Sequence, residues 1–189
     1  MKIAIVKLSA LGDIVNAMVV LQFIKKNNPK IKIDWVVEKA YKELLSNNPN
    51  VNKVHTVNFK LAKQKKSLPI FFKEIKKIRQ FGKFDIVIDM QGLIKSAFVS
   101  RMISSEVTVG FHRSSSRESI SSIFYSHKFK IVYKENIICR NLSLVANSLN
   151  FTFKGNEIQN KDPFLYPSKK YIPSSFSKSM QNIVLIPGA

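Results

Sequence analysis

Short runs of apolar, mostly β-branched residues alternate along this chain with stretches in which apolar residues recur every three or four positions. The first pattern predicts buried strands and the second predicts amphipathic helices. Strands are expected at residues 2–7, 31–37, 53–57, 85–89, 107–109 and 128–133, with a further apolar run at 183–186. Helices are expected at residues 13–26, 39–45, 69–81, 94–103 and 135–149. This alternation predicts an α/β fold with a parallel sheet and right-handed crossovers.

Ligands of such folds bind in the turns that leave the carboxyl ends of the strands. Those turns are residues 8–13, 58–67, 90–96, 110–118 and 187–189. The turn at 58–67 is polar and strongly basic, and we expect a mobile loop there. A polar stretch with several prolines, residues 150–181, has the composition of a linker. The expected organisation is a domain over residues 1–150, a linker over 151–182, and the first strand of a second domain over 183–189.

The charge of the chain limits the classes of molecule that it is expected to bind. Lys and Arg number 31 against 12 Asp and Glu, which gives a formal net charge of +19. A generally Lys-rich composition explains part of this excess. The rest favours an acidic partner: nucleic acid, anionic lipid, or a phosphorylated or carboxylated substrate. One cysteine excludes an intrachain disulfide and fits a reducing compartment, and no apolar run is long enough to cross a membrane. We therefore expect a cytoplasmic protein.

Asp13 stands in the first of these turns, which reads Ser9-Ala10-Leu11-Gly12-Asp13. It is expected to cap the following helix, to act as a general base, or both. A carboxylate here suits a proton that is lost late in a reaction, as in attack by a sugar hydroxyl. The turn has one glycine where a dinucleotide fingerprint has three, so we expect no pyrophosphate against its backbone.

Lysines dominate the second turn. Lys60, Lys63, Lys65 and Lys66 form either a solvated run or a flexible set of phosphate ligands. The turn leaves the same rim of the sheet as Asp13, which favours the second interpretation.

Further cations occupy the remaining turns. Lys95 falls in the first turn of a predicted helix, where the dipole disfavours a cation, so either it binds an anion or it is simply solvated. Arg113 and Arg117 can bind a carboxylate through two parallel hydrogen bonds, pair with Glu118, or simply be exposed to solvent. Arg140 interrupts an apolar helical pattern, and a partly buried arginine needs an anionic partner.

Several catalytic classes leave no pattern in the sequence. The three histidines share no metal-ligand spacing, and there is no P-loop and no Ser-His-Asp order. We therefore expect neither a metal nor an organic cofactor.

Five segments together resemble the ADP-heptose glycosyltransferase family, family 9. They are VKLSALGDIVNAMVVL, IDWVVE, FDIVIDMQGLIKSAFVSR, SRESISSIFYSHK and the helix that carries Arg140. The resemblance implies a Rossmann-like acceptor half of a GT-B fold, with a short start of the second domain. It also implies inverting, metal-independent transfer of heptose from ADP-heptose to Kdo of Kdo-lipid A, by a monomer at the inner face of the inner membrane.

The resemblance also assigns roles to residues. Asp13 would be the general base, and Gly12 and Gly188 would lie near the donor. The acceptor would be held by Ser9, Lys60, Lys63, Lys65, Lys66, Lys95, Arg117 and Arg140. The family's D-T-G-x-x-H donor motif does not occur in this sequence, so we expect negligible transfer by the chain alone.

Two other classes remain open beside this one. A basic anion-binding module without catalysis, for nucleic acid or an anionic membrane surface, would explain the charge, but no RNP, KH or helix-turn-helix signature appears. A Rossmann-type oxidoreductase is opposed by the missing glycines.

Overall fold

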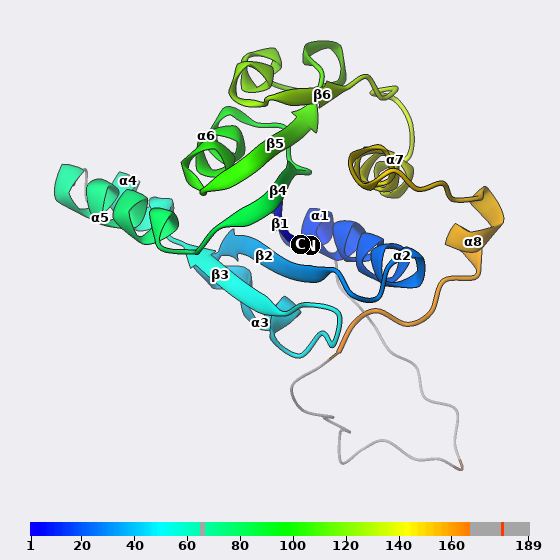
Figure 1. The fold of residues 1–189 in the computed structure, drawn as a ribbon. Coiled ribbons are helices and arrows are strands. Elements are labelled where there is room, and N and C mark those ends of the chain that lie inside the picture. The colour runs from blue at the N-terminus through cyan, green and yellow to red at the C-terminus, as the bar shows by residue number, and fades with distance from the viewer. Residues whose placement is uncertain (65–66, 167–178, 180–189) are drawn as a thin grey trace.

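The computed structural model of this chain describes residues 1–64, 67–166 and 179 (Figure 1). The strands are β1 (Lys2–Val6), β2 (Lys32–Glu38), β3 (Lys53–Val57), β4 (Phe84–Asp89), β5 (Ser105–Phe111) and β6 (His127–Phe129). The α-helices are α1 (Leu11–Met18), α2 (Val20–Asn27), α3 (Glu43–Ser46), α4 (Phe59–Gln64), α5 (Leu68–Arg79), α6 (Ile94–Met102), α7 (Ile137–Leu149) and α8 (Gly155–Gln159). Short 3-10 helices are η1 (Lys39–Tyr41), η2 (Arg113–Ser115) and η3 (Ser119–Phe124).

The strands form one parallel sheet in the order β3-β2-β1-β4-β5-β6. This order confirms the predicted α/β class and is the Rossmann-like arrangement that the resemblance implies. The chain winds outward in opposite directions from β1 and from β4, so these two neighbouring strands make the topological switch point. Ligands of such sheets bind in the crevice beyond this point, at the carboxyl ends of the strands.

Helices cover both faces of the sheet (Figure 1). Alternate residues of β1 point to opposite faces, as strand geometry requires. Ile3 and Ile5 join a core with the buried sides of α1, α2 and α7, whereas Ala4 and Val6 join a second core with residues of α5 and α6. Both faces are therefore filled, which explains why the strands read as nearly continuous apolar runs.

Several predicted elements are corrected by the structure. The strand expected over residues 128–133 is β6, which ends at Phe129, and the helix expected over residues 39–45 is divided into η1 and α3. Residues 59–64 of the expected loop form α4, whose first turn is closed by Asn58 Oδ1 accepting a hydrogen bond from the Leu61 amide at 3.2 Å. The helix expected over residues 13–26 begins earlier, at Leu11, and is divided at Val19 into α1 and α2. A polar and basic composition does not reveal that Asn58 closes the first turn of α4, and apolar periodicity does not reveal the break at Val19.

The first part of the segment after residue 150 packs against the domain. Phe151, Phe153 and Phe164 pack against the core, and the side-chain Nζ of Lys26 in α2 pairs with Glu157 of α8 at 2.5 Å. The expected strand at 183–186 lies outside the described residues. Within the part of the chain that the structure describes, no helix has the length and hydropathy needed to cross a membrane.

Candidate functional site

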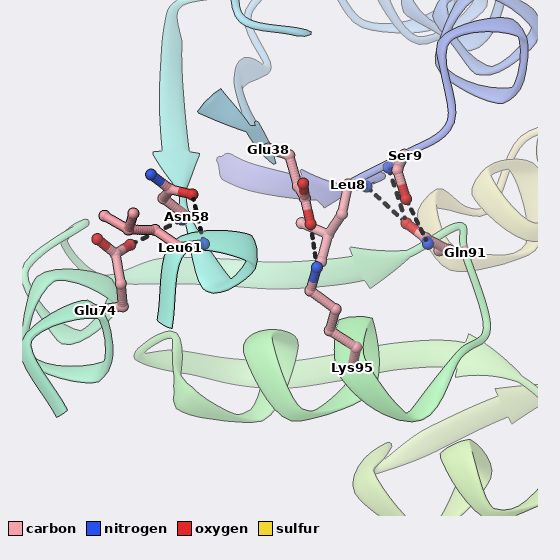
Figure 2. Close-up of polar contacts among 8 residues, drawn as sticks. All are labelled: Leu8, Ser9, Glu38, Asn58, Leu61, Glu74, Gln91 and Lys95. Carbon is pink, nitrogen blue, oxygen red and sulfur yellow. Dashed lines mark hydrogen bonds and ion pairs between the residues drawn. The ribbon is translucent and has the colours of Figure 1, made fainter. Parts of the chain in front are cut away.

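The turn after β1 is tied to the turn after β4 by one side chain. The Gln91 Oε1 accepts hydrogen bonds from the backbone amides of Leu8 at 2.7 Å and Ser9 at 3.3 Å, and its Nε2 donates to Ser9 Oγ at 3.4 Å (Figure 2). These contacts span the switch point. They fix the path of the backbone just before it enters α1, and so they position the residues of that helix's first turn.

Gln91 is in turn placed by Asp89, the last residue of β4. Asp89 is fully buried, and its Oδ1 accepts hydrogen bonds from the amides of Gln91 at 2.8 Å and Gly92 at 3.3 Å. Its Oδ2 accepts one from the Tyr125 hydroxyl at 2.8 Å. Burial raises the pKa of Asp89, while the hydrogen bonds from Gln91, Ser96, Tyr125 and Gly92 oppose that rise. A buried carboxylate with this many donors is a structural anchor for the turn.

Tyr125 reaches Asp89 only because residue 110 is a glycine. A Cβ placed on Gly110 would lie 2.3 Å from Cε2 of the Tyr125 ring. The ring therefore crosses β5 directly over the bare Cα. Gly92 is also required, because its φ of +68° is a left-handed conformation that side chains other than glycine rarely adopt.

Lys7 is a buried cation at the same point. It follows β1, is 3% exposed, and donates from Nζ to the Met90 carbonyl at 3.2 Å. Burial lowers the pKa of Lys7, and the negative charges of Asp13 and Asp89 oppose this shift. The sequence signal for Lys7 and Asp89 is their place at the ends of the apolar runs KIAIVK and DIVID.

Asp13 lies on this rim but does not cap its helix, so the predicted capping role is wrong. The N-cap residue of α1 is Ala10, and Asp13 is an acidic residue within the first turn. Its side chain is exposed, and within the described residues it has no hydrogen bond or salt bridge. The helix dipole stabilises a carboxylate at this position. Asp13 is thus an exposed carboxylate without a hydrogen bond in the described residues, and its charge influences the pKa of the buried Lys7.

Gly12 precedes Asp13 and is exposed, with nothing within 4 Å of the position its Cβ would take. Its lack of a side chain is therefore not required by the packing of this chain. The backbone there is bare toward the rim, which leaves room for a ligand to approach.

Carboxylates of the chain itself contact Lys95 and the first backbone amide of α6. Lys95 forms a salt bridge with Glu38, at the end of β2 (Figure 2). Glu118 Oε2 accepts a hydrogen bond from the Ile94 amide at 2.7 Å. The expected cost of a cation in this first turn is therefore offset by two carboxylates, and Glu118 is not the partner of Arg113 or Arg117.

Arg140 forms no salt bridge among the described residues, although the charge of Glu135 acts on it. Its Nη2 donates to the Ser115 carbonyl at 2.7 Å, and its guanidinium carbon lies 5.0 Å from the ring centroid of Phe111 and 4.7 Å from that of Tyr133. Its Nε is buried without a hydrogen-bond partner. Burial lowers the pKa of Arg140. Within the chain, two π-faces and a carbonyl oxygen therefore accommodate the guanidinium, and the expectation of an anionic partner stays a prediction about a ligand.

The structure describes the side chains of only some of the remaining predicted site residues. Arg117 is exposed beyond the carboxyl end of β5. Lys60 and Lys63 lie in α4, but their side chains are outside the described part of the structure, as are Lys65, Lys66 and Gly188 entirely. In the described ranges no group of three His, Cys, Asp or Glu residues is arranged to hold a metal ion.

The arrangement at the switch point has a definite chemical capacity. A free carboxylate, Asp13, stands on a backbone turn held by Gln91, with the buried charge of Lys7 nearby. Such a carboxylate can accept a proton from a hydroxyl group, and the turn before it is fixed by hydrogen bonds to Gln91. Exposed cations of the neighbouring turns, including Arg117, favour an anionic molecule as the owner of that hydroxyl.

The chain is similar in sequence to known heptosyltransferases. A profile described as glycosyltransferase family 9 (heptosyltransferase) matches residues 71–189. Lipopolysaccharide heptosyltransferase 1 of Campylobacter coli is 38% identical over 181 residues, covering 96% of this chain and 51% of that protein. The protein of the same name from Escherichia coli K12 is 32% identical over 155 residues, covering 80% of this chain and 49% of that protein. The chain thus spans about half the length of these curated relatives.

A solved structure extends the likeness to three dimensions. Escherichia coli heptosyltransferase WaaC with ADP-2-deoxy-2-fluoro heptose has a TM-score of 0.77 and 31% identity to this chain, covering 82% of this chain and 50% of that one. The match confirms the fold class, a Rossmann-like α/β sheet that corresponds to about half of a GT-B heptosyltransferase.

Proposed function

The chain belongs to glycosyltransferase family 9, and from this premise we propose that it forms the acceptor-binding half of a heptosyltransferase of lipopolysaccharide inner-core synthesis. The proposed donor is ADP-heptose, supported by the nucleotide-heptose analogue bound to the related WaaC. The proposed acceptor is Kdo of Kdo-lipid A, whose phosphates and carboxylates would match the net charge of +19. The chain would act as a monomer on the cytoplasmic face of the inner membrane.

Asp13 carries this proposal, as a free and exposed carboxylate on a turn that Gln91 fixes at the switch point. The acceptor hydroxyl oxygen would attack the anomeric carbon of the heptose, and Asp13 would take the proton of that hydroxyl. A new glycosidic bond forms as the bond from the anomeric carbon to the phosphate oxygen breaks. ADP leaves with the electron pair, and the anomeric configuration is inverted.

The acceptor would be held by Ser9 and by cations, which would bind its anionic groups. The proposed ligands are Ser9, Lys60, Lys63, Lys65, Lys66, Lys95, Arg117 and Arg140. Of these, Arg117 is exposed with no described partner, whereas Lys95 would have to exchange Glu38 for the substrate. Gly12 would leave room for the donor, and Gly188 would belong to the donor side.

The proposed domain organisation follows the same reasoning. Residues 1–150 would bind the acceptor, 151–182 would link, and 183–189 would begin the donor-binding domain. Because the family's donor motif does not occur in this sequence, the chain alone would transfer no heptose.

A chimera tests the proposal. Residues 1–166 would be joined to the second half of the Campylobacter coli relative and supplied with ADP-heptose and Kdo-lipid A. The chimera is expected to form heptosyl-Kdo-lipid A with inverted configuration, and the 189-residue chain alone to form none. A folded chimera that binds ADP but transfers no heptose, or transfer by the chain alone, would contradict the proposal.

The alternative function is an anion-binding module without catalysis, which the net charge favours. It predicts binding of anionic vesicles or nucleic acid together with an inactive chimera. Product formation by the chimera excludes it.

A further inference from the structure

The outer face of α5 exposes two large apolar side chains one helical turn apart. Leu68 is 70% exposed and Phe72 is 62% exposed. Leu61 of the adjacent α4 is 36% exposed. Side chains four residues apart lie on the same side of a helix, so Leu68 and Phe72 form one apolar surface.

This surface is not needed to hold α5 in place. The inner face of the helix is already occupied: the Phe71 ring lies 5.7 Å from that of Phe59 and 6.2 Å from that of Phe98, and Ile78 is fully buried. Glu74 accepts a hydrogen bond from the Asn58 amide at 3.0 Å (Figure 2). The helix is therefore anchored by other contacts, and the exposed apolar pair is available for a partner.

Three cations share the outer face with this pair. Lys73, Lys76 and Arg79 are exposed, and none has a salt bridge within the described residues. The one acid of the helix, Glu74, turns instead toward Asn58 and Lys77. The outer face is thus apolar in its first half and purely basic in its second, which is the composition of a helix that lies on an anionic bilayer.

The position of the face suits this partner. Glu74 meets Asn58 directly after the end of β3, and α5 begins six residues earlier, about 9 Å along a helix axis. The start of α5 therefore stands off the carboxyl rim, where Figure 1 shows α4 and α5 projecting from the sheet. A bilayer in contact with Leu68 and Phe72 would lie beside the rim that carries Asp13.

We propose that the outer face of α5, made of Leu68, Phe72, Lys73, Lys76 and Arg79, is a docking surface for an anionic lipid bilayer. The apolar pair enters the boundary between headgroups and acyl chains, and the cations bind anionic headgroups. The choice of a bilayer rests on the proposed function, but vesicles without acceptor test the docking separately from sugar transfer.

A tryptophan reporter gives the first test. The chain has one tryptophan, Trp35, which is fully buried. The fluorescence of a second tryptophan at the surface is therefore obtained by subtracting the emission of the parent chain from that of the variant. Phe72→Trp in the full chain is expected to shift its emission to the blue on addition of phosphatidylglycerol-containing vesicles, and to be quenched by brominated lipid. Ile123→Trp, at a residue that is 71% exposed in η3, is the matched control and is expected to show neither change. An unshifted Phe72→Trp would overturn the proposal.

Co-sedimentation with the same vesicles gives the second test. Leu68→Ser with Phe72→Ser, and Lys73→Glu with Lys76→Glu, should each weaken vesicle binding by at least about tenfold. The matched controls are Ile123→Ser and the exposed pair Lys53→Glu with Lys128→Glu, which should bind like the parent. Parent-like binding by both α5 variants, equal binding to neutral vesicles, or loss of nucleic-acid binding without loss of vesicle binding would each contradict the proposal.

Discussion

The Tyr125 hydroxyl donates a 2.8 Å hydrogen bond to the buried carboxylate of Asp89, 36 residues earlier in the chain. This bond lies beneath the candidate site rather than in it. Asp89 holds the amides of Gln91 and Gly92, and Gln91 holds the amides of Leu8 and Ser9. The geometry of the turn before Asp13 therefore depends on a series of hydrogen bonds that begins at the buried Tyr125.

Gly110→Ala should destabilise the protein, because the new methyl group would meet the Tyr125 ring at 2.3 Å. Overpacking of this kind costs about 1–3 kcal/mol of unfolding free energy, measured by urea denaturation. Gly12→Ala is the matched control, since its methyl group meets nothing within 4 Å. A Gly to Ala change inside a helix is expected to stabilise by up to about 1 kcal/mol. Equal effects of the two changes would contradict this account of Gly110.

Gln91→Ala should lower the kcat of the chimera strongly while lowering its unfolding free energy only modestly. The change removes the oxygen that accepts hydrogen bonds from the Leu8 and Ser9 amides, so the backbone of the turn before Asp13 is no longer held in one position. We expect kcat to fall by about tenfold or more, with an unfolding free energy within about 2 kcal/mol of the parent. Gln91→Glu retains the accepting oxygen and should recover most of the rate. If Gln91→Glu is as slow as Gln91→Ala, Gln91 does not act through that oxygen.

Asp34 should make stability depend on pH in the acid range. It is fully buried, and burial alone would raise its pKa. Hydrogen bonds from His55 at 2.8 Å and Asn52 at 2.9 Å, together with Lys2, lower the pKa below its ordinary value. A carboxyl group with a lowered pKa stabilises the fold above its ordinary pKa, and this contribution is lost as pH falls through the lowered value.

Asp34→Asn should therefore cost about 1–3 kcal/mol at neutral pH and make the fall in stability below about pH 4 shallower than in the parent. Urea titrations at a series of pH values measure both effects. Asp162→Asn controls for the loss of an exposed carboxylate. A variant whose stability falls in parallel with that of the parent would rule out Asp34 as a source of the pH dependence.

The alternation of strands and helices, and the turns that form the carboxyl rim of the sheet, follow from the sequence, because apolar patterns and turn residues determine them locally. The strand order depends on non-local pairing and comes from the structure. The pattern DIVID predicts β4, and the turn after it is identified as part of the site without further information. The pairing of Tyr125 with Asp89 and the close approach at Gly110 depend on side chains brought together by the completed sheet, so no local pattern reveals them.

At the basic segment, residues 58–67, the prediction from the sequence was wrong. Its composition predicts a loop, yet Asn58 begins α4 there by accepting a hydrogen bond from the Leu61 amide. This difference arises because a local side-chain contact outweighs the average behaviour of a composition.

The most direct test of the central proposal is the turnover of the Asp13→Asn chimera together with its affinity for Kdo-lipid A. If Asp13 takes the acceptor's proton, kcat should fall by about 10²–10⁴-fold while acceptor binding is retained, since Asn keeps the size of the side chain. Turnover close to that of the parent chimera would show that Asp13 is a residue of the α1 first turn and not the base.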